Sequence, residues 1–350
     1  MKILAIETSC DETACAVVEK NKILSSVVAS SQEIHKKYGG IVPEQAAREQ
    51  IKCIIPVIQE ALNKAKCGKS DIDTIAVTVG PGLIGSLLVG VETAKTLSYV
   101  LKKPIIPINH LIAHIYANFI NSQLDALLIR KSIFPAICLI ASGGHTSLVL
   151  MKKHGQFKII GQTKDDAAGE CFDKCSRLLG LGYPGGPAIE EQTSKFKVSK
   201  FDNLSSRQLG LKIKLPRPIL NDKTFNFSFS GLKTAVFYLL KKANKPEKNK
   251  VFINQLASEI QEAVSDILVK KTINAALKYK AKSIMIGGGV AANLRLREKF
   301  KSATDNLKIN LFIPKIEWCT DNAASIAVTA FYNFKPVHWS KIKTNPSLTI

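Results

Sequence analysis

The chain opens with KILAIETSCDETACAVVE (residues 2–19), the segment that says most about its architecture. It reads as an apolar strand, a tight polar turn and a second apolar strand, and runs of small and branched apolar residues are typical of strands buried in a sheet. The same plan returns in FPAICLIASGGHTSLVLM (residues 134–151), where two apolar runs flank a turn of small residues. A repeated strand–turn–strand unit predicts two related lobes with a cleft between their facing turns.

Strands and helices alternate through the rest of the chain, which is typical of an α/β fold. The spacing of apolar residues predicts helices over 43–65, 251–279 and 322–332, and strands over 74–79, 105–108, 157–161, 283–286 and 309–313. We expect an N-terminal lobe over residues 1–130, a C-terminal lobe over 131–335 and a tail over 336–350. Residues 196–224 are predicted to form a surface excursion, and residues 241–250 a solvated linker.

The composition limits the classes of function. No apolar run approaches the eighteen or more residues that a membrane span needs, and Glu7, Asp11 and Glu12 interrupt any signal peptide, so a soluble, cytoplasmic protein without a membrane partner is expected. The net charge of +21 suggests an anionic partner. Only seven of the 49 basic residues are arginine, so charge alone leaves nucleic-acid binding open. Cys171 and Cys175 could chelate a metal, but buried small side chains are the favoured interpretation.

The run NHLIAH (residues 109–114) places His110 and His114 one helical turn apart, so both imidazoles can reach one ion. A zinc protease of the HExxH type needs a glutamate after the first histidine, and this chain has Leu111 there. A pair of polar surface histidines is the alternative. In EWCTDNAASIA (residues 317–327), Asp321 could complete a two-histidine, one-carboxylate site, or Thr320 or Asp321 could simply cap the last helix.

Three further segments suggest a nucleotide site. Gly143 and Gly144 form either an anion-binding nest or an ordinary hairpin turn. In IMIGGGVAANLRLR (residues 284–297), three glycines precede a predicted helix, where phosphate commonly binds, and Asn293 could hydrogen-bond a ribose or base; close packing is the alternative. Asp173 lies deep in the helix predicted for DDAAGECFDK (residues 165–174) and is hard to explain as surface charge.

These five motifs occur in the order, and over nearly the whole length, of the tRNA threonylcarbamoyladenosine transferases, the TsaD family, which the chain resembles. The resemblance implies two ribonuclease-H-like lobes of the actin, sugar-kinase and heat-shock-chaperone ATPase (ASKHA) fold. It implies one divalent ion, Fe²⁺ or Zn²⁺, held by His110, His114 and Asp321. It also implies substrate contacts at Ile140, Ala141, Ser142, Gly143, Gly144, Asp173, Gly186 and Asn293.

The details of the motifs refine this resemblance. Ile140 and the SGGHT turn resemble the bacterial and mitochondrial branch. PEQAAREQ (residues 43–50) departs from the PELASRxH of many members, which puts in doubt any role here of the leucine and histidine that Gln45 and Gln50 replace.

The resemblance implies transfer of a threonylcarbamoyl group from threonylcarbamoyl-AMP to the exocyclic amine of adenosine 37, beside the anticodon of tRNAs that read codons beginning with A. The implied partners are tRNA, the subunits TsaB and TsaE, and a separate threonylcarbamoyl-AMP synthase. No general base is identifiable. The alternatives are a metal-dependent ATPase or kinase-like protein of the same fold, a non-enzymatic tRNA-binding subunit, and a metalloprotease, which Leu111 disfavours.

Overall fold

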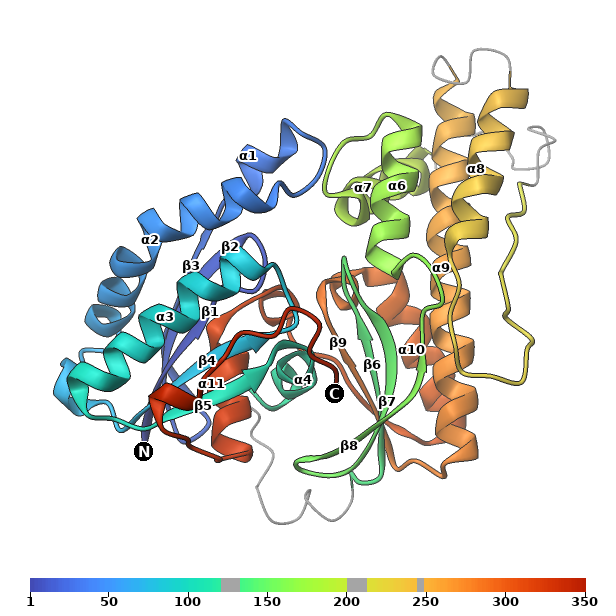
Figure 1. Cartoon of the computed structure of the whole chain (residues 1–350). Helices are drawn as coiled ribbons and strands as arrows, with labels where there is room; N and C mark the ends of the chain where they lie inside the picture. Colours follow the sequence, from blue (N-terminus) through green and yellow to red (C-terminus); the bar gives the residue numbers. More distant parts are fainter. Residues whose placement is uncertain (121–132, 200–212, 244–248) are drawn as a thin grey trace.

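The computed structural model describes residues 1–120, 133–199, 213–243 and 249–350. Two lobes lie side by side, each built on a five-stranded sheet (Figure 1). The strands of the first sheet, from one edge to the other, are β3 (Lys22–Ser30), β2 (Glu12–Glu19), β1 (Lys2–Glu7), β4 (Thr74–Gly80) and β5 (Ile105–Asn109). Those of the second are β8 (Gln156–Gln162), β7 (Thr146–Lys153), β6 (Ala136–Ala141), β9 (Ser283–Gly287) and β10 (Asn310–Phe312).

The two sheets have the same topology, which confirms the repeat predicted from the two strand–turn–strand units. The first three strands of each sheet pair antiparallel, β1 with β2 with β3 and β6 with β7 with β8. The first strand of each then pairs parallel with the fourth, and the fourth with the fifth. Parallel pairing requires a crossover connection, and the helices that make these crossovers cover the faces of the sheets.

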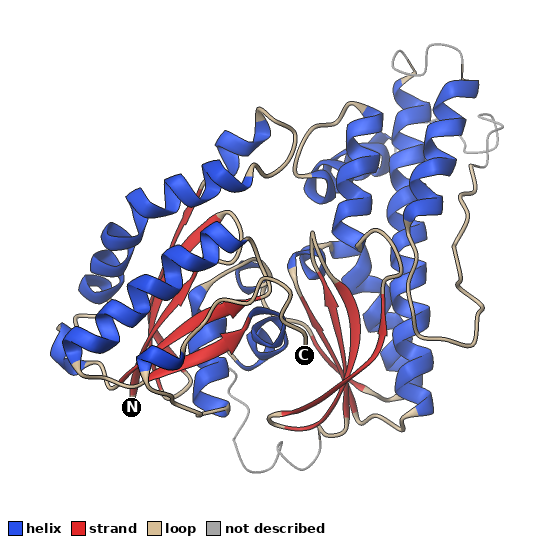
Figure 2. Ribbon diagram, viewed as in Figure 1, coloured by secondary structure: helices blue, strands red, loops and turns tan. Residues whose placement is uncertain are grey.

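The helices and sheets form alternating layers (Figure 2). Helices α2 (Pro43–Lys64) and α3 (Ile84–Leu101) cover the outer face of the first sheet; the short α1 (Gln32–Lys36) precedes them. Helices α4 (His110–Tyr116) and α11 (Ala323–Tyr332) lie in the apolar layer between the two sheets. The outer face of the second sheet packs on α6 (Ala168–Leu179), α8 (Ser230–Lys242), α9 (Lys250–Lys278) and α10 (Leu294–Leu307), with α7 (Gly185–Ser199) beside α6 and α9.

Alternation along β1 shows why the strands are apolar throughout. Ile3 and Ala5 face the central layer, whereas Leu4 and Ile6 face α2 and α3. Successive side chains of a strand point to opposite faces, so a strand covered on both faces must be apolar at every position.

The end of the chain returns to the first lobe. Helix α11 lies within the range expected for the second lobe, yet it packs against β1 and β2. The predicted tail is ordered against the same lobe: the N–H of Val337 donates to the carbonyl of Ile105 (2.8 Å), and that of Asn345 to the carbonyl of Val79 (2.7 Å). The lobes therefore do not divide at one point of the sequence, because the last helix is needed to fill the layer between the sheets.

Two predicted surface segments are described only in part. Residues 200–212 of the expected excursion and 244–248 of the expected linker lie outside the described residues.

Helix α3 is, within the described part of the chain, the one helix long and apolar enough to cross a membrane. It packs against β4 and α2, as a covering helix of an α/β lobe does.

Candidate active site

Local capping places the three predicted metal ligands. Asn109 caps α4, its Oδ1 accepting from the N–H groups of Leu111 (2.9 Å) and Ile112 (3.2 Å), so His110 is the first residue of the helix. Asn322 caps α11 by accepting from the N–H of Ser325 (2.9 Å). The alternative in which Thr320 or Asp321 caps this helix is therefore wrong. Asp321 stands just before the cap, and its carboxylate is left to face α4.

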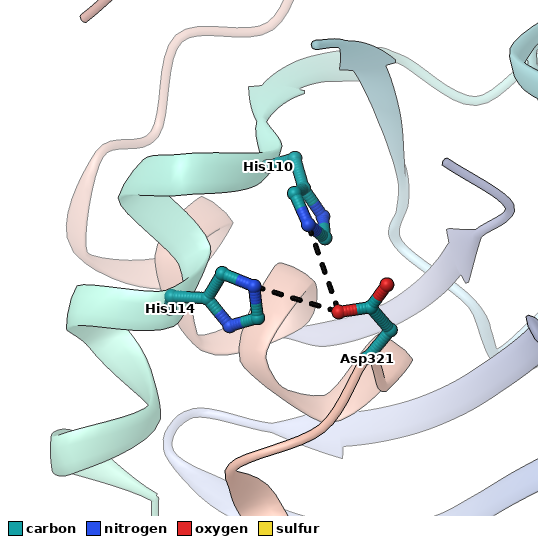
Figure 3. A group of neighbouring side chains, drawn as sticks. All are labelled: His110, His114 and Asp321. Carbon is teal, nitrogen blue, oxygen red and sulfur yellow. Dashed lines mark ion pairs between the residues drawn. The ribbon is translucent and has the colours of Figure 1, made fainter. Parts of the chain in front are cut away.

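His110, His114 and Asp321 come together at the inner edge of the first lobe (Figure 3). Asp321 Oδ1 lies 3.6 Å from His110 Nε2 and 3.4 Å from His114 Nε2, and one ligand atom of each residue lies within 4.8 Å of the other two. The rings are only 8% and 3% exposed. Among the residues that the structure describes, this is the one cluster of three histidine, cysteine or acidic side chains with the spacing of a metal site.

The donor set fits a divalent transition metal. Two ligands about 2.1 Å from a tetrahedral ion are roughly 3.4 Å apart, and the two histidine–aspartate distances agree with that separation. His114 Nε2 is buried, points at Asp321 and has no hydrogen-bond partner, which is unusual for a buried polar atom. Two imidazoles and one carboxylate suit iron or zinc almost equally.

A buried carboxylate orients His110. The Nδ1 atom of His110 lies 3.2 Å from Glu7 Oε2 and 3.1 Å from Ser9 Oγ. These two contacts turn Nε2 of His110 toward Asp321. Glu7 is 1% exposed and also accepts hydrogen bonds from the N–H of Ser9 and the hydroxyl of Thr78. Glu7 and Ser9 were not predicted from the sequence as parts of the site. The available signal was a glutamate at the end of a buried strand, because a buried charge needs a partner.

These groups set one another's charge. Burial alone would raise the pKa of Glu7, but the charge of His110 and the hydrogen bonds lower it to about 2. Burial opposes protonation of His110, yet Asp321 and Glu7 together raise its pKa to about 9. Burial and the neighbouring His110 lower the pKa of His114 to about 3, and burial raises that of Asp321 to about 6. The carboxylates of Glu7 and Asp321 thus stabilise a positive charge between them. A proton on His110 supplies this charge when no metal ion is bound.

The turn after β6, which contains Gly143 and Gly144, lies next to the glycines at the end of β9, Gly287 to Gly289. Both lie beside the histidines. Strands β6 and β9 pair so that Ile140 stands opposite Gly287. A Cβ on Gly287 would lie 2.3 Å from the carbonyl oxygen of His114, and one on Gly288, whose φ is +92°, would lie 2.3 Å from that of Ala141. Close packing therefore explains these two glycines. The small size of Gly287 also lets β9 of the second sheet lie directly against α4, the helix that carries His110 and His114.

Other glycines border open space. A Cβ on Gly143, Gly144, Gly186 or Gly289 would meet nothing within 4 Å, and none of the four has a φ that favours glycine. Packing does not explain these four glycines, and each leaves open the space that a side chain would fill. Gly289 begins a short 3₁₀ segment (Gly289–Ala292), and α10 starts only after Asn293. The prediction that the three glycines lead straight into α10 is therefore wrong.

The remaining predicted contacts have structural partners. Ile140 and Ala141 are fully buried residues at the end of β6, where Ile140 pairs with Gly287 and Ala141 with Thr146. Asn293 caps α10 through Leu296 N–H (2.9 Å) and donates to Gln261 Oε1 (3.0 Å). Asp173 accepts from the N–H of Gly185 (2.7 Å). It also lines a cavity of about 310 Å³ between the lobes, together with Lys36, Gly39, Arg177, Gly180, Gly182 and Tyr183.

Two cysteines and a third histidine lie outside the metal cluster. Cys171 and Cys175 are fully buried in the core of the second lobe, as their interpretation as small apolar side chains predicts. His145 lies in the β6–β7 turn, where burial and the charge of His110 lower its pKa. It therefore lies within electrostatic range of the metal ligands.

Known proteins resemble this chain over its whole length. The family model for tRNA N6-adenosine threonylcarbamoyltransferase matches residues 22–328. Relatives that carry this name include proteins from Syntrophomonas wolfei (47% identity, covering 99% of this chain and 97% of the relative), Kosmotoga olearia (48%, covering 100% and 99%) and Bacillus subtilis (46%, covering 96% and 91%).

Solved structures agree with the fold. Full-length HypF aligns with a TM-score of 0.58 at 12% identity, covering 97% of this chain and 47% of that one. Component A of the (R)-2-hydroxyglutaryl-CoA dehydratase of Acidaminococcus fermentans aligns with a TM-score of 0.50 at 14% identity, covering 95% and 98%. At such low identity these structures show only that the architecture is the ASKHA fold. The relatives of nearly equal length go further: this chain belongs to the tRNA N6-adenosine threonylcarbamoyltransferase (TsaD) family.

Proposed function

We propose that this protein transfers the threonylcarbamoyl group of threonylcarbamoyl-AMP to N6 of adenosine 37 in tRNAs that read codons beginning with A. Membership of the family makes it a tRNA adenosine threonylcarbamoyltransferase; the donor and the set of tRNAs are the proposed part. In this reaction the adenine amine attacks the carbamoyl carbon, and a C–N bond forms. The bond between that carbon and the phosphate oxygen breaks, AMP leaves with the electron pair, and the amine loses a proton.

One observation carries the proposal: in a chain of this family, two imidazoles and a carboxylate converge beside glycine turns that packing does not explain. His110, His114 and Asp321 would hold one Fe²⁺ or Zn²⁺ ion. Such an ion supplies Lewis-acid stabilisation of negative charge and a fixed template for the donor. Glu7 and Ser9 keep the ring of His110 in its orientation through Nδ1.

The substrate contacts are proposed from the accessible backbone. The amides around Gly143, Gly144 and Gly289 would bind the adenylate part of the donor, with Ile140, Ala141 and Ser142 beside them; the open space at these glycines supports this proposal. Asp173, Gly186 and Asn293 are proposed as further contacts. Their structural hydrogen bonds support a positioning role, because Asp173 and Asn293 hold the segments that border the cleft. The charge of +21 suits the phosphates of tRNA.

The rival activities fit the site less well. A metalloprotease needs a carboxylate free to activate water, whereas Glu7, the buried carboxylate beside His110, is committed to three hydrogen-bond partners. Kinases and ATPases bind Mg²⁺ through carboxylates and phosphates, and this cluster presents two imidazoles.

We also propose that TsaB and TsaE are the partner subunits and that a separate threonylcarbamoyl-AMP synthase supplies the donor. The outer helices of the first lobe carry exposed apolar side chains at one-turn spacing, Ile51 and Ile55 on α2 and Ile84 and Leu88 on α3. Helices α2 and α3 pack against each other, and such an apolar surface suits another protein chain.

The test is mass spectrometry of nucleosides from tRNA treated with the protein, TsaB, TsaE and threonylcarbamoyl-AMP. We expect threonylcarbamoyladenosine to appear only when this chain and the donor are both present. A tRNA in which adenosine 37 is replaced by guanosine serves as the control and should stay unmodified. No modified nucleoside with a complete set of partners would overturn the proposal.

A further inference from the structure

Helix α8 presents an exposed face that combines aromatic and basic side chains. Leu232 and Val236 are buried against the second lobe. The opposite face carries Phe237 and Tyr238, which are 48% and 57% exposed, with ring centroids 5.7 Å apart. Lys233 lies one turn before the rings, and Lys241 and Lys242 lie one turn after them. We call Lys233, Phe237, Tyr238, Lys241 and Lys242 the α8 face.

The charge of the α8 face is not neutralised locally. Helix α8 contains three lysines and no acidic residue, and no ion pair joins these lysines to a carboxylate in the parts of the chain that the structure describes. The neighbouring α9 and α10 differ, because Arg295 and Lys299 pair with Glu262. Other described lysines of this lobe also lack an ion pair, but on the α8 face three of them flank two exposed aromatic rings, and this combination indicates an anionic partner with planar rings.

A short chain of hydrogen bonds links the start of α8 to the Ser142 turn. Asp165 accepts from the N–H groups of Phe229 (2.7 Å) and Ser230 (3.2 Å) and so fixes the start of α8. Four residues after Asp165, the N–H of Gly169 donates to the carbonyl of Ser142 (3.1 Å). Ser142 lies in the turn next to the metal ligands. From this start α8 extends for 13 residues, or about 20 Å, to the outer edge of the second lobe (Figure 1).

We infer that the α8 face binds the tRNA substrate outside the reacting nucleotide, an inference that rests on the proposed function. Its lysines contact backbone phosphates, and Phe237 and Tyr238 stack on an unpaired base. Charge complementarity favours RNA, since unpaired lysines bind phosphate and aromatic rings stack on any exposed base. A nucleic acid whose target adenosine lies in the cleft must continue along the surface, and Asp165, which holds the start of α8, lies four residues before Gly169 and its contact with the Ser142 turn.

The test measures the dissociation constant of the full-length protein for unmodified tRNA by fluorescence anisotropy over a range of salt concentrations. We expect the double variant Phe237→Ala/Tyr238→Ala to bind about ten-fold more weakly, since stacking on one base is worth roughly five- to a hundred-fold. Lys233→Gln/Lys241→Gln should lower the slope of log affinity against log salt by about 1.4, from roughly 0.7 for each phosphate contact. In the modification assay both variants should raise the KM for tRNA and leave kcat unchanged.

Matched controls come from the first lobe. Tyr99→Ala removes an aromatic side chain that is 64% exposed on α3. Lys64→Gln removes an exposed lysine that is paired with Glu60 on α2. Both controls should keep the affinity for tRNA within about two-fold of that of the unaltered protein.

Three results would overturn the inference. The first is unchanged tRNA affinity and salt slope in both α8 variants. The second is unchanged tRNA binding together with lost binding to vesicles of phosphatidylcholine and one-third phosphatidylserine, which would make the face a membrane site. The third is an effect that appears only when the partner subunits are present, which would make it a protein contact. If the unaltered protein binds tRNA through α8 but makes no threonylcarbamoyladenosine, the proposed function fails and this inference stands.

Discussion

Replacing Gln50 with leucine tests whether α2 holds the β1–β2 turn in place for the metal centre. Gln50 is fully buried, and its Nε2 donates to the carbonyls of Cys10 and Glu12, both at 3.0 Å. Between them, the carbonyl of Asp11 accepts from the N–H (3.2 Å) and hydroxyl (2.8 Å) of Ser31. The turn is thus held at three successive carbonyls, one residue after the serine that contacts His110.

The expected cost follows from these contacts. Leucine leaves two half-buried carbonyls without this donor, and an unsatisfied group costs up to about 1–3 kcal/mol. The substitution also removes Gln50 Oε1, a buried oxygen with no partner, which offsets about 1–3 kcal/mol. We therefore expect a net loss of about 1–3 kcal/mol. Because Ser9 moves with the turn, the affinity for the metal ion and the rate of tRNA modification should fall as well.

Three variants make the assay specific. Urea unfolding, metal content after dialysis and tRNA modification are measured for Gln50→Leu, Gln50→His and Gln59→Leu. Gln59 lies exposed on the same helix, so its substitution should change stability by less than about 0.5 kcal/mol. Histidine, the residue that the resemblance places at position 50 in many members, can offer one donor to the two carbonyls and should give an intermediate loss. If Gln50→Leu matches Gln59→Leu in stability, metal content and rate, the turn does not depend on α2.

Further predictions concern the metal site, the glycine turns and the start of α8. Asp321→Ala should lower metal content and modification together; full metal occupancy would remove Asp321 from the site. Gly287→Ala should cost about 1–3 kcal/mol and weaken metal binding, since its Cβ would lie 2.3 Å from the carbonyl oxygen of His114. Gly144→Ala, with nothing within 4 Å, should change stability by less than about 0.5 kcal/mol but raise the KM for the donor, and equal effects of the two glycine variants on stability would contradict this division. Asp165→Ala should destabilise by about 1 kcal/mol at pH 7. Burial raises the pKa of Asp165, but the hydrogen bonds from Ser228, Phe229 and Ser230 outweigh it and hold the pKa below that of an ordinary aspartate. The contribution of Asp165 is therefore present above the ordinary value and should disappear as the pH falls through the lowered folded value. A difference from the unaltered protein that persists at pH 2 would contradict this account.

Local patterns predicted most of the elements. The apolar runs over 2–19 and 134–151 correspond to the β1–β2 and β6–β7 pairs, and helix 43–65 appears as Pro43–Lys64 with Pro56 inside it. Strand β3 escaped prediction because only two of its nine residues are buried, so its sequence lacks the continuous apolar character of its neighbours. The return of α11 to the first sheet also could not be foreseen, since nothing in a helix's own sequence says which of two apolar faces it will cover.

The sequence by itself determined the repeated lobe, the histidine pair on one helix face and the family. These depend on periodicity and on motif order, which a chain carries along its length. Only the tertiary structure decided that Asn322 caps α11 and leaves Asp321 to face the histidines, that Glu7 orients His110, and that Gly287 serves packing whereas Gly144 borders open space. Each of those facts concerns residues about a hundred or more positions apart or the volume around a single atom. Such contacts depend on how the elements pack, and packing is a property of the whole fold.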